Sequence, residues 1–246
     1  MRKPVYILFI AAAFMTAAVI ALAGCATADK RVAFGESPIA IVSIVSNRDI
    51  NWKDESPVDP SKAIRAVRRN MEENPDVNIA TLASDFIEEI EQLIRNSLET
   101  SPFITFVPRG SVLSSRSYLD ADPYSYHVKE QLVKPTGYRY INYRDKNFLR
   151  DFAAETGIKK TLFISLDLTK NMSMGIGKTG NFRASVTMTV MLKDEKGKTL
   201  FNKVYTQLSP DQAKVSIGQY SHADLRQLML SAIGEVCYHL MDDIAY

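Results

Sequence analysis

The sequence predicts a single domain of the α/β (α+β) class, with a mixed β-sheet and helices mainly on one face. Three observations lead to this prediction. Residues 182–192 alternate apolar and polar side chains, which is typical of a half-buried strand, and residues 225–244 carry apolar side chains at the three-and-four spacing of a helix. The order of the other segments, with strands and helices in alternation, is typical of a sheet covered by helices. We expect this domain to span residues 38–246.

The amino-terminal segment predicts export. A basic start at Arg2-Lys3 precedes an apolar run, and the run ends in Leu22-Ala23-Gly24-Cys25. A small-residue cleavage site directly before a cysteine allows the thiol to be linked to a diacylglycerol and then to become the acylated new amino terminus. This motif resembles the lipobox of bacterial lipoproteins. The resemblance implies that residues 1–24 are a cleaved signal peptide and that Cys25 is a lipid anchor.

An uncleaved transmembrane helix is the alternative interpretation of this segment, because about 18 apolar residues reach the lower limit of membrane-spanning length. Residues 26–30 contain no basic cluster that would arrest transfer, and Cys25 stands where the apolar run stops. Lipidation accounts for both features. Residues 25–37 then form a short tether, with a reach of about 40 Å even when fully extended. In Gram-negative lipoproteins an aspartate directly after the cysteine marks the inner membrane, so the resemblance, with Ala26 there, implies the periplasmic side of the outer membrane.

The composition argues against a nucleic-acid-binding role. Removal of residues 1–24 takes away two basic residues and leaves 28 basic against 28 acidic side chains. A neutral chain lacks the basic footprint that nucleic acid requires. Once Cys25 is acylated, Cys237 is the remaining cysteine. We therefore expect neither an intramolecular disulfide nor a cysteine-rich metal site.

The first half of the domain predicts two strands and a helix. Residues 39–46 form a β-branched run that ends at Asn47, which is typical of a strand. Apolar side chains from Leu82 to Leu98 follow one helical face, and the Ser101-Pro102 pair stops the helix. A second strand is expected over residues 103–107.

The second half predicts a helix, a strand, a hairpin and a final helix. A short helix fits residues 145–156, with Gly157 at its carboxyl end, and leads into an apolar strand over residues 162–168. The alternating strand that begins at Phe182 turns at residues 194–197 into residues 199–207, which predicts an antiparallel hairpin. The final helix starts after Ser221, a suitable amino-terminal cap.

This order of elements resembles the small α/β domains of penicillin-binding-protein activator lipoproteins, of the curli-secretion lipoprotein and of the amino-terminal domain of the Tol-system translocation protein. The resemblance rests on element order and on the lipobox, and it spans roughly residues 38–244 with a large interruption. The short tether departs from an activator that reaches through the cell wall. A curli-type channel would also need membrane-crossing hairpins, whereas the hairpin at 182–207 is expected in the core sheet.

A tyrosine-rich excursion, at about residues 108–146, interrupts this order. It holds six of the eleven tyrosines of the chain: Tyr118, Tyr124, Tyr126, Tyr138, Tyr140 and Tyr143. Tyrosines interleaved with arginines suit a protein or glycan surface, and connections this long are often functional. The alternative is a structural role, in which the tyrosines lie against the domain and cover a sheet edge.

Trp52 is the second candidate contact residue. This single tryptophan of the chain stands in a polar loop, beside Lys53, Asp54 and Glu55. A tryptophan in such a loop is either a contact anchor or a side chain that folds back onto the core. The candidate binding residues are therefore Trp52, Tyr118, Tyr124, Tyr126, Tyr138 and Tyr140.

The sequence offers no catalytic, cofactor or metal signature. Residues 175–180 resemble a phosphate loop, but Met172 occupies the position of its first glycine and a strand follows, so we expect a loop and no nucleotide site. The three histidines lack the spacing of a zinc motif. Asp120 and Asp122 alternate as in a calcium loop, but Pro123 takes the next position. Cys237 lies on the apolar stripe of the final helix, which predicts a core residue and not a nucleophile.

Two functions from different classes fit these observations. The first is a non-enzymatic envelope lipoprotein that is held to the membrane by its lipid and binds another envelope protein or peptidoglycan. The second is a membrane-tethered hydrolase of glycan or lipid, with an acid and a base among scattered carboxylates that the sequence does not identify. An enzyme should show a concave pocket with two converging ionisable groups, whereas a binding module should show an exposed aromatic patch.

Overall fold

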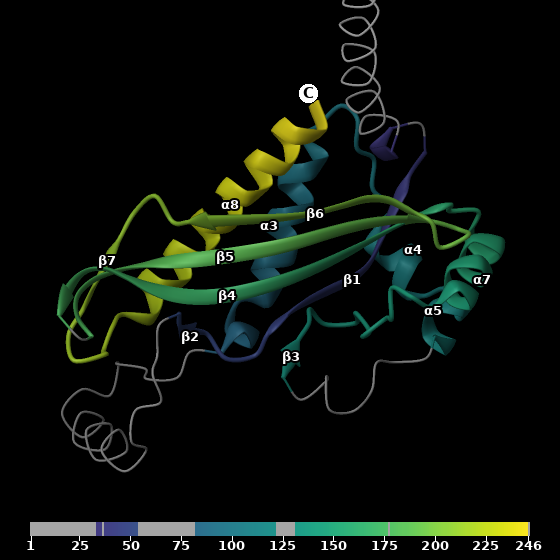
Figure 1. Cartoon of the computed structure of the whole chain (residues 1–246). Coiled ribbons are helices and arrows are strands. Elements are labelled where there is room, and N and C mark those ends of the chain that lie inside the picture. The colour runs from purple at the N-terminus through teal and green to yellow at the C-terminus, as the bar shows by residue number, and fades with distance from the viewer. Residues whose placement is uncertain (1–32, 36, 54–81, 122–130, 177, 246) are drawn as a thin grey trace, which may run out of the picture.

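The computed structural model describes residues 33–35, 37–53, 82–121, 131–176 and 178–245. The lipobox with Cys25, the acidic neighbours of Trp52, and both Tyr124 and Tyr126 lie outside these residues. The described part is a mixed α/β domain built around one seven-stranded sheet, which confirms the predicted fold class. Figure 1 shows the sheet as a long, twisted band with helices packed against it.

The central path of the sheet runs β3-β1-β4-β5-β6. The strands are β1 (Ile39–Asn47), β2 (Asn51–Trp52), β3 (Leu132–Val133), β4 (Lys160–Ile176), β5 (Thr179–Asp194), β6 (Thr199–Leu208) and β7 (Ala213–Val215). β1 and β4 are parallel, while β5 pairs antiparallel with both β4 and β6. A parallel pair requires a long crossover, and the residues between β1 and β4 supply it.

The predicted hairpin at 182–207 is confirmed by β5 and β6, which turn at Asp194–Lys198. The predicted strand at 162–168 is also present, but it is part of the much longer β4. β4 and β5 pair as far as Ile176 and Thr179, so the expected loop at 175–180 is the narrow end of a second hairpin. The predicted strand ends at Leu168 because the polar residues Thr169, Lys170 and Asn171 interrupt the apolar run, and pairing with β5 is what keeps them extended.

The predicted strand at 103–107 is wrong in extent. Only Phe106 forms a bridge, to Ile39, and the N–H of Val107 donates to the Ile39 carbonyl at 2.9 Å. The N–H of Ile104 donates instead to the Ser101 carbonyl at 3.3 Å in a turn, so the start of this segment does not join the ladder, and Pro108 has no N–H with which to extend it.

The two longest helices lie on one face of the sheet, as predicted. They are α3 (Ile87–Glu99), preceded by the 3-10 turn η1 (Ala83–Asp85), and α8 (His222–Ala245). Their apolar stripes pack on the inward side chains of β4, β5 and β6 and form the main core, in which Cys237 is fully buried. The prediction that Cys237 is a core residue is therefore confirmed.

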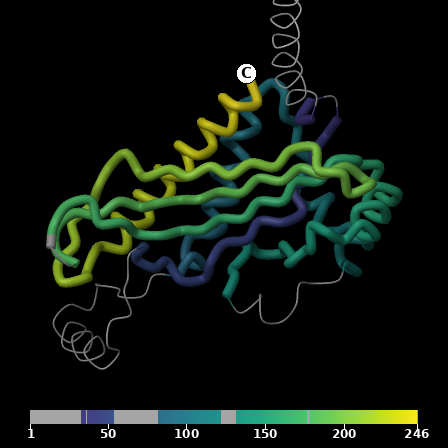
Figure 2. Tube along the Cα trace, in the orientation of Figure 1, coloured from purple at the N-terminus to yellow at the C-terminus, as the bar shows by residue number. Residues whose placement is uncertain are grey.

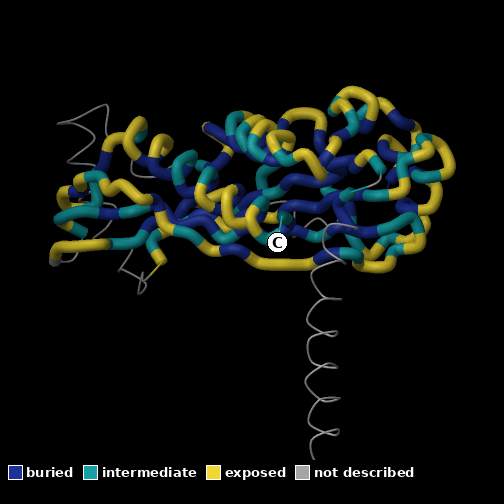
Figure 3. The backbone as a smooth tube through the Cα atoms, turned by 90° about the horizontal axis from the view of Figure 1, so that it is seen from above, coloured by how far each residue is buried: buried dark blue, intermediate teal, exposed yellow. Residues whose placement is uncertain are grey.

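Three short helices cover one end of the opposite face. They are α4 (Arg109–Leu113), α5 (Arg116–Asp120) and α7 (Lys146–Thr156). They enclose a second, smaller core with Ala40 and Val42 of β1 and Phe163 of β4. Figure 2 traces how these helices gather at the end of the sheet where β4 begins, and Figure 3 shows buried residues between the layers and exposed residues around them. The described part of the excursion thus belongs to the folded domain.

Candidate binding groove

The described part of the tyrosine-rich excursion is fixed to the domain by its tyrosines. Tyr118 is fully buried, its hydroxyl donates to the Val42 carbonyl at 3.1 Å, and it accepts from the Arg139 N–H at 2.8 Å. Tyr140 is half-buried and its hydroxyl donates to the Leu132 carbonyl at 2.8 Å. Leu132 belongs to β3, which pairs with β1 at the sheet edge. These contacts support the structural alternative, in which the tyrosines lie against the domain and cover a sheet edge.

A buried carboxylate holds the excursion to α3. Glu91 is 4% exposed and accepts hydrogen bonds from the Tyr138 hydroxyl at 3.0 Å, from Arg95 at 3.3 Å and from Arg109 at 3.2 Å. The Arg109 guanidinium also lies over the Tyr138 ring, 5.1 Å from its centroid. Burial, together with the Glu91 charge, raises the pKa of Tyr138, so its hydroxyl stays protonated and continues to donate. Tyr138 is therefore unavailable to a partner while this network is intact.

Trp52 packs inward at the other end of the sheet. Its ring makes edge contacts with Phe182 at 5.5 Å and with Tyr220 at 6.2 Å between centroids. The ammonium of Lys170, itself buried, lies 5.2 Å from the Trp52 centroid and 4.6 Å from that of Tyr220. Trp52 and the tyrosines of the excursion are therefore not brought together into one surface.

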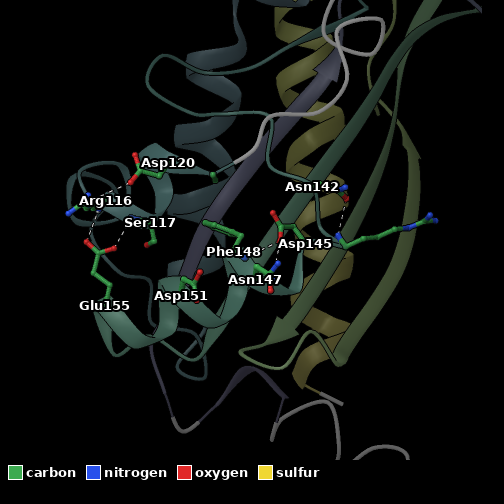
Figure 4. A pocket seen from close by; sticks show the side chains of 11 residues that line it. Arg116, Ser117, Asp120, Asn142, Asp145, Asn147, Phe148, Asp151 and Glu155 are labelled. Atoms are coloured by element: carbon green, nitrogen blue, oxygen red, sulfur yellow. Dashed lines mark hydrogen bonds and ion pairs between the residues drawn. The ribbon is translucent and has the colours of Figure 1, made fainter.

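An open groove of about 880 Å³ lies between the excursion and α7, and it is lined by α5, by residues 142–145 and by α7. Figure 4 shows the side chains that line it, with Arg116, Asp120 and Glu155 on one side and Asn142 on the other. Apart from Ala121 and Phe148 the lining is polar: Arg116, Ser117, Asp120, Asn142, Arg144, Asp145, Asn147, Asp151 and Glu155. Amide, carboxylate and guanidinium groups alternate there, so the groove presents donors and acceptors to any ligand.

Two of the carboxylates in the groove are committed to helix ends. Asp145 is the N-cap of α7 and accepts from the N–H groups of Asn147 and Phe148, both at 3.0 Å. Glu155 accepts at 2.7 Å from the backbone N–H groups of Arg116 and Ser117. Hydrogen bonds from Ser117 and Arg116 lower the pKa of Glu155. A carboxylate with a lowered pKa stays ionised at neutral pH and is a poor general acid.

The other two carboxylates form exposed ion pairs. Asp120 pairs with Arg116 at 3.4 Å, and Asp151 pairs with Arg150 at 3.0 Å, with all four side chains more than half exposed. An exposed pair of this kind is weak and exchanges readily with a charged ligand. The groove is therefore suited to binding a polar ligand, through charges that can be exchanged and through the amides beside them.

Outside the groove, the described side chains that were considered above as a nucleophile or as metal ligands lie apart from one another. Burial raises the pKa of Cys237 to about 12, so its thiol stays protonated. His222 is the first residue of α8, and its Nε2 lies 3.3 Å from a carboxylate oxygen of Asp85. It is far along the helix from Cys237. Among the described residues, no three or more His, Cys, Asp or Glu side chains come close enough to hold a metal ion. Nor does any described helix have the length and apolar character needed to cross a membrane.

The sequence alone indicates little of the groove. Asp120 stands out only by its alternation with Asp122. The other lining residues come from two helices about 30 residues apart and from the segment just before the second helix. The one local signal is the spacing Asp145-Lys146-Asn147-Phe148, in which an aspartate precedes a helix as its cap. A cap predicts a helix end and says nothing about a ligand.

No protein-family model matches this sequence, and no curated protein matches it. Among solved structures, the C-terminal domain of LpoB from Salmonella enterica is 10% identical, with a TM-score of 0.28, over 70% of this chain and 83% of that chain. The hypothetical protein CT253 from Chlamydia trachomatis is 9% identical, with a TM-score of 0.34, over 86% of this chain and 94% of that chain. Both TM-scores are too low to establish a shared overall fold, so neither similarity assigns a function.

Proposed function

We propose that this chain is a lipid-anchored envelope protein whose α/β domain binds another envelope component, a protein or peptidoglycan, without catalysing a reaction. The proposal places the anchor at Cys25 and the binding surface in the groove between α5 and α7. The location is the periplasmic side of the outer membrane, as the residue after Cys25 suggests. Tyr124 and Tyr126, next to Asp120 in sequence, remain proposed contact residues.

The observation that carries the binding role is that two carboxylates of the groove are already engaged in hydrogen bonds at helix ends. Glycoside hydrolysis needs one carboxylic acid that keeps its proton and one ionised partner a few ångströms away. Here Glu155 and Asp145 hold the ends of α5 and α7, and Glu155 has a lowered pKa. Asp120 and Asp151 are each held in an exposed ion pair, and the other groups that remain for a ligand are Asn142, Asn147 and Arg144, which are hydrogen-bonding groups and not acid-base catalysts.

The anchor is tested by substituting Cys25→Ala in the full chain. We expect the variant to lose labelling by a radioactive or clickable fatty acid, and to leave the membrane pellet or accumulate with its signal peptide uncleaved. Labelling and processing equal to the wild type would contradict the assignment.

The groove is tested by capture from solubilised envelopes with the full-length lipoprotein, and by co-sedimentation with isolated peptidoglycan. The double variant Asn147→Ala/Arg144→Ala should reduce the captured component at least fivefold. The matched control is Lys214→Ala, a basic side chain at the opposite end of the sheet, beyond the groove. Equal loss in the control, or no loss in the double variant, would reject the groove as the binding surface. Hydrolysis of purified peptidoglycan that Asp120→Asn/Asp151→Asn abolishes would instead support the enzyme.

A further inference from the structure

β6 forms an open border of the sheet. It ends the strand order, and no strand of the described residues pairs with its outer side. In Figure 2 this strand follows the upper margin of the sheet over its whole length. An unpaired edge of ten residues is a template for pairing with another strand, and proteins that must avoid this protect such edges with charges, prolines or a covering element.

The hydrogen bonds of β6 show which residues face the open side. Leu208 is opposite Ser185, and the N–H of Ser209 donates to the Ala184 carbonyl at 2.8 Å. This geometry makes Leu208–Ser185 a non-hydrogen-bonded pair of the antiparallel ladder. The register has no shift between Leu208 and Phe201, so every second residue shares this property. The backbone N–H and C=O groups of Asn202, Val204, Thr206 and Leu208 therefore point away from β5.

The side-chain contacts agree with this assignment of the residues whose backbone groups point away from β5. The hydroxyls of Thr187 and Thr206 lie 3.0 Å apart, as expected for directly opposite residues in a closely spaced, non-hydrogen-bonded pair. The side chains of the residues that face outward lie on the sheet face away from α8, and all four are exposed. Val204 is 57% and Leu208 42% exposed, which makes them two of the largest exposed apolar side chains described.

The usual protection of an edge strand is weak in β6. Its single charged residue, Lys203, points to the helix side, where its ammonium contacts Asp243 of α8 at 2.6 Å. Tyr205 points to the same side, and its hydroxyl donates to Asp243 at 2.7 Å. The outward series Asn202, Val204, Thr206 and Leu208 contains no ionised group, so nothing on it repels a second copy.

We propose that two copies of this chain pair antiparallel through β6, about a twofold axis at Thr206. Thr206 then faces Thr206 of the second copy, and Val204 of each copy packs against Leu208 of the other. The hydrogen-bonding groups that point outward at Val204, Thr206 and Leu208 are all used in this register. The two Lys203 side chains stay about 20 Å apart, because each is three residues from the axis.

A single cysteine at the axis tests the proposal in the full-length, membrane-bound protein. Thr206→Cys places two thiols at a Cα separation of about 5.5 Å, which allows a disulfide after mild oxidation. The matched control is Thr187→Cys, which removes the same hydroxyl contact but lies one strand further in, so its two thiols are about 15 Å apart. Buried Cys237 stays unreactive in both variants.

We expect a band of twice the monomer mass from Thr206→Cys on a non-reducing gel, and at least tenfold less from Thr187→Cys. Equal yields from both variants, no dimer from Thr206→Cys, or an adduct of another mass would overturn the proposal. Adding Val204→Lys to Thr206→Cys should lower the dimer yield at least fivefold, whereas adding Asn202→Lys, outside the paired region, should not. An unchanged yield with Val204→Lys would overturn the register.

Discussion

At the scale of single residues, buried hydroxyls and one buried carboxylate fix the excursion to the sheet. Tyr118 and Tyr138 are each at most 1% exposed, and each exchanges hydrogen bonds with groups more than 20 residues away. Tyrosines in such a segment suggest a contact surface, because the ring suits a partner as well as a core. Sequence cannot decide between these roles, because the partners of the hydroxyls, Val42 and Glu91, lie on other elements.

Replacing Glu91 tests this network. Glu91→Gln removes the charge that compensates two guanidinium groups, of Arg95 and Arg109, with side chains 14% and 31% exposed. We expect the free energy of unfolding to fall by about 3 kcal/mol, as for other broken buried ion pairs. Urea denaturation measures it, with Glu88→Gln as the control because that carboxylate is about half exposed. A loss no larger than the control's would show that the network does not stabilise the domain.

Tyr118 gives the domain a dependence on alkaline pH. Burial raises the pKa of Tyr118 to about 12 from the ordinary value of 10.0. The unfolded chain therefore loses this proton first, so the stability that Tyr118 contributes is complete below pH 10 and is lost as the pH rises towards 12. We expect the free energy of unfolding of the wild type to fall across this window, and to fall less steeply in Tyr118→Phe. Denaturation curves from pH 9 to 12 with equal slopes would contradict this.

At the scale of elements, the β4–β5 hairpin depends on glycine at its end. Gly175 and Gly180 have φ values of 134° and 145°, and they face each other across the two strands. A Cβ on Gly180 would lie 2.1 Å from the Met174 carbonyl oxygen, which no side-chain movement can relieve. The glycines therefore allow the close backbone approach that ends the hairpin.

Gly180→Ala should lower the free energy of unfolding by about 2 kcal/mol or more, because it combines a backbone clash with an unfavourable φ. Gly110→Ala is the matched control. Gly110 lies in α4, and a methyl group added there would meet nothing within 4 Å, so we expect a change of less than about 1 kcal/mol, in the stabilising direction. Similar thermal unfolding of the two variants would show that the hairpin end is not closely packed.

At the scale of the whole molecule, the elements predicted from sequence are those with a local signal. The β5–β6 hairpin, α7 and α8 follow from alternation, a cap and an apolar stripe, all of which are properties of adjacent residues. The far half of β4 is not predicted because Thr169, Lys170 and Asn171 interrupt its apolar run, and pairing with β5 is what keeps these residues in the strand. The groove is likewise a product of tertiary structure, since α5 and α7 are brought together by Glu155 and the second core.

The shape of the molecule separates the two proposed surfaces. The groove lies at the end of the sheet that carries α5 and α7, whereas β6 forms a long border of its own, as Figure 1 shows. Partner binding in the groove and pairing of two copies through β6 are therefore independent. A variant in one surface should leave the other intact.

Photo-crosslinking in intact cells, from a photoreactive residue placed in the full-length lipoprotein, is the decisive test of the binding role. Asn147 is the groove position, and Thr187, on the open face of the sheet, is the control. We expect one dominant envelope protein, or peptidoglycan fragments, to be attached at Asn147 and absent at Thr187. No adduct at Asn147 in a folded, membrane-bound protein, or the same adducts at both positions, would contradict a binding role for the groove.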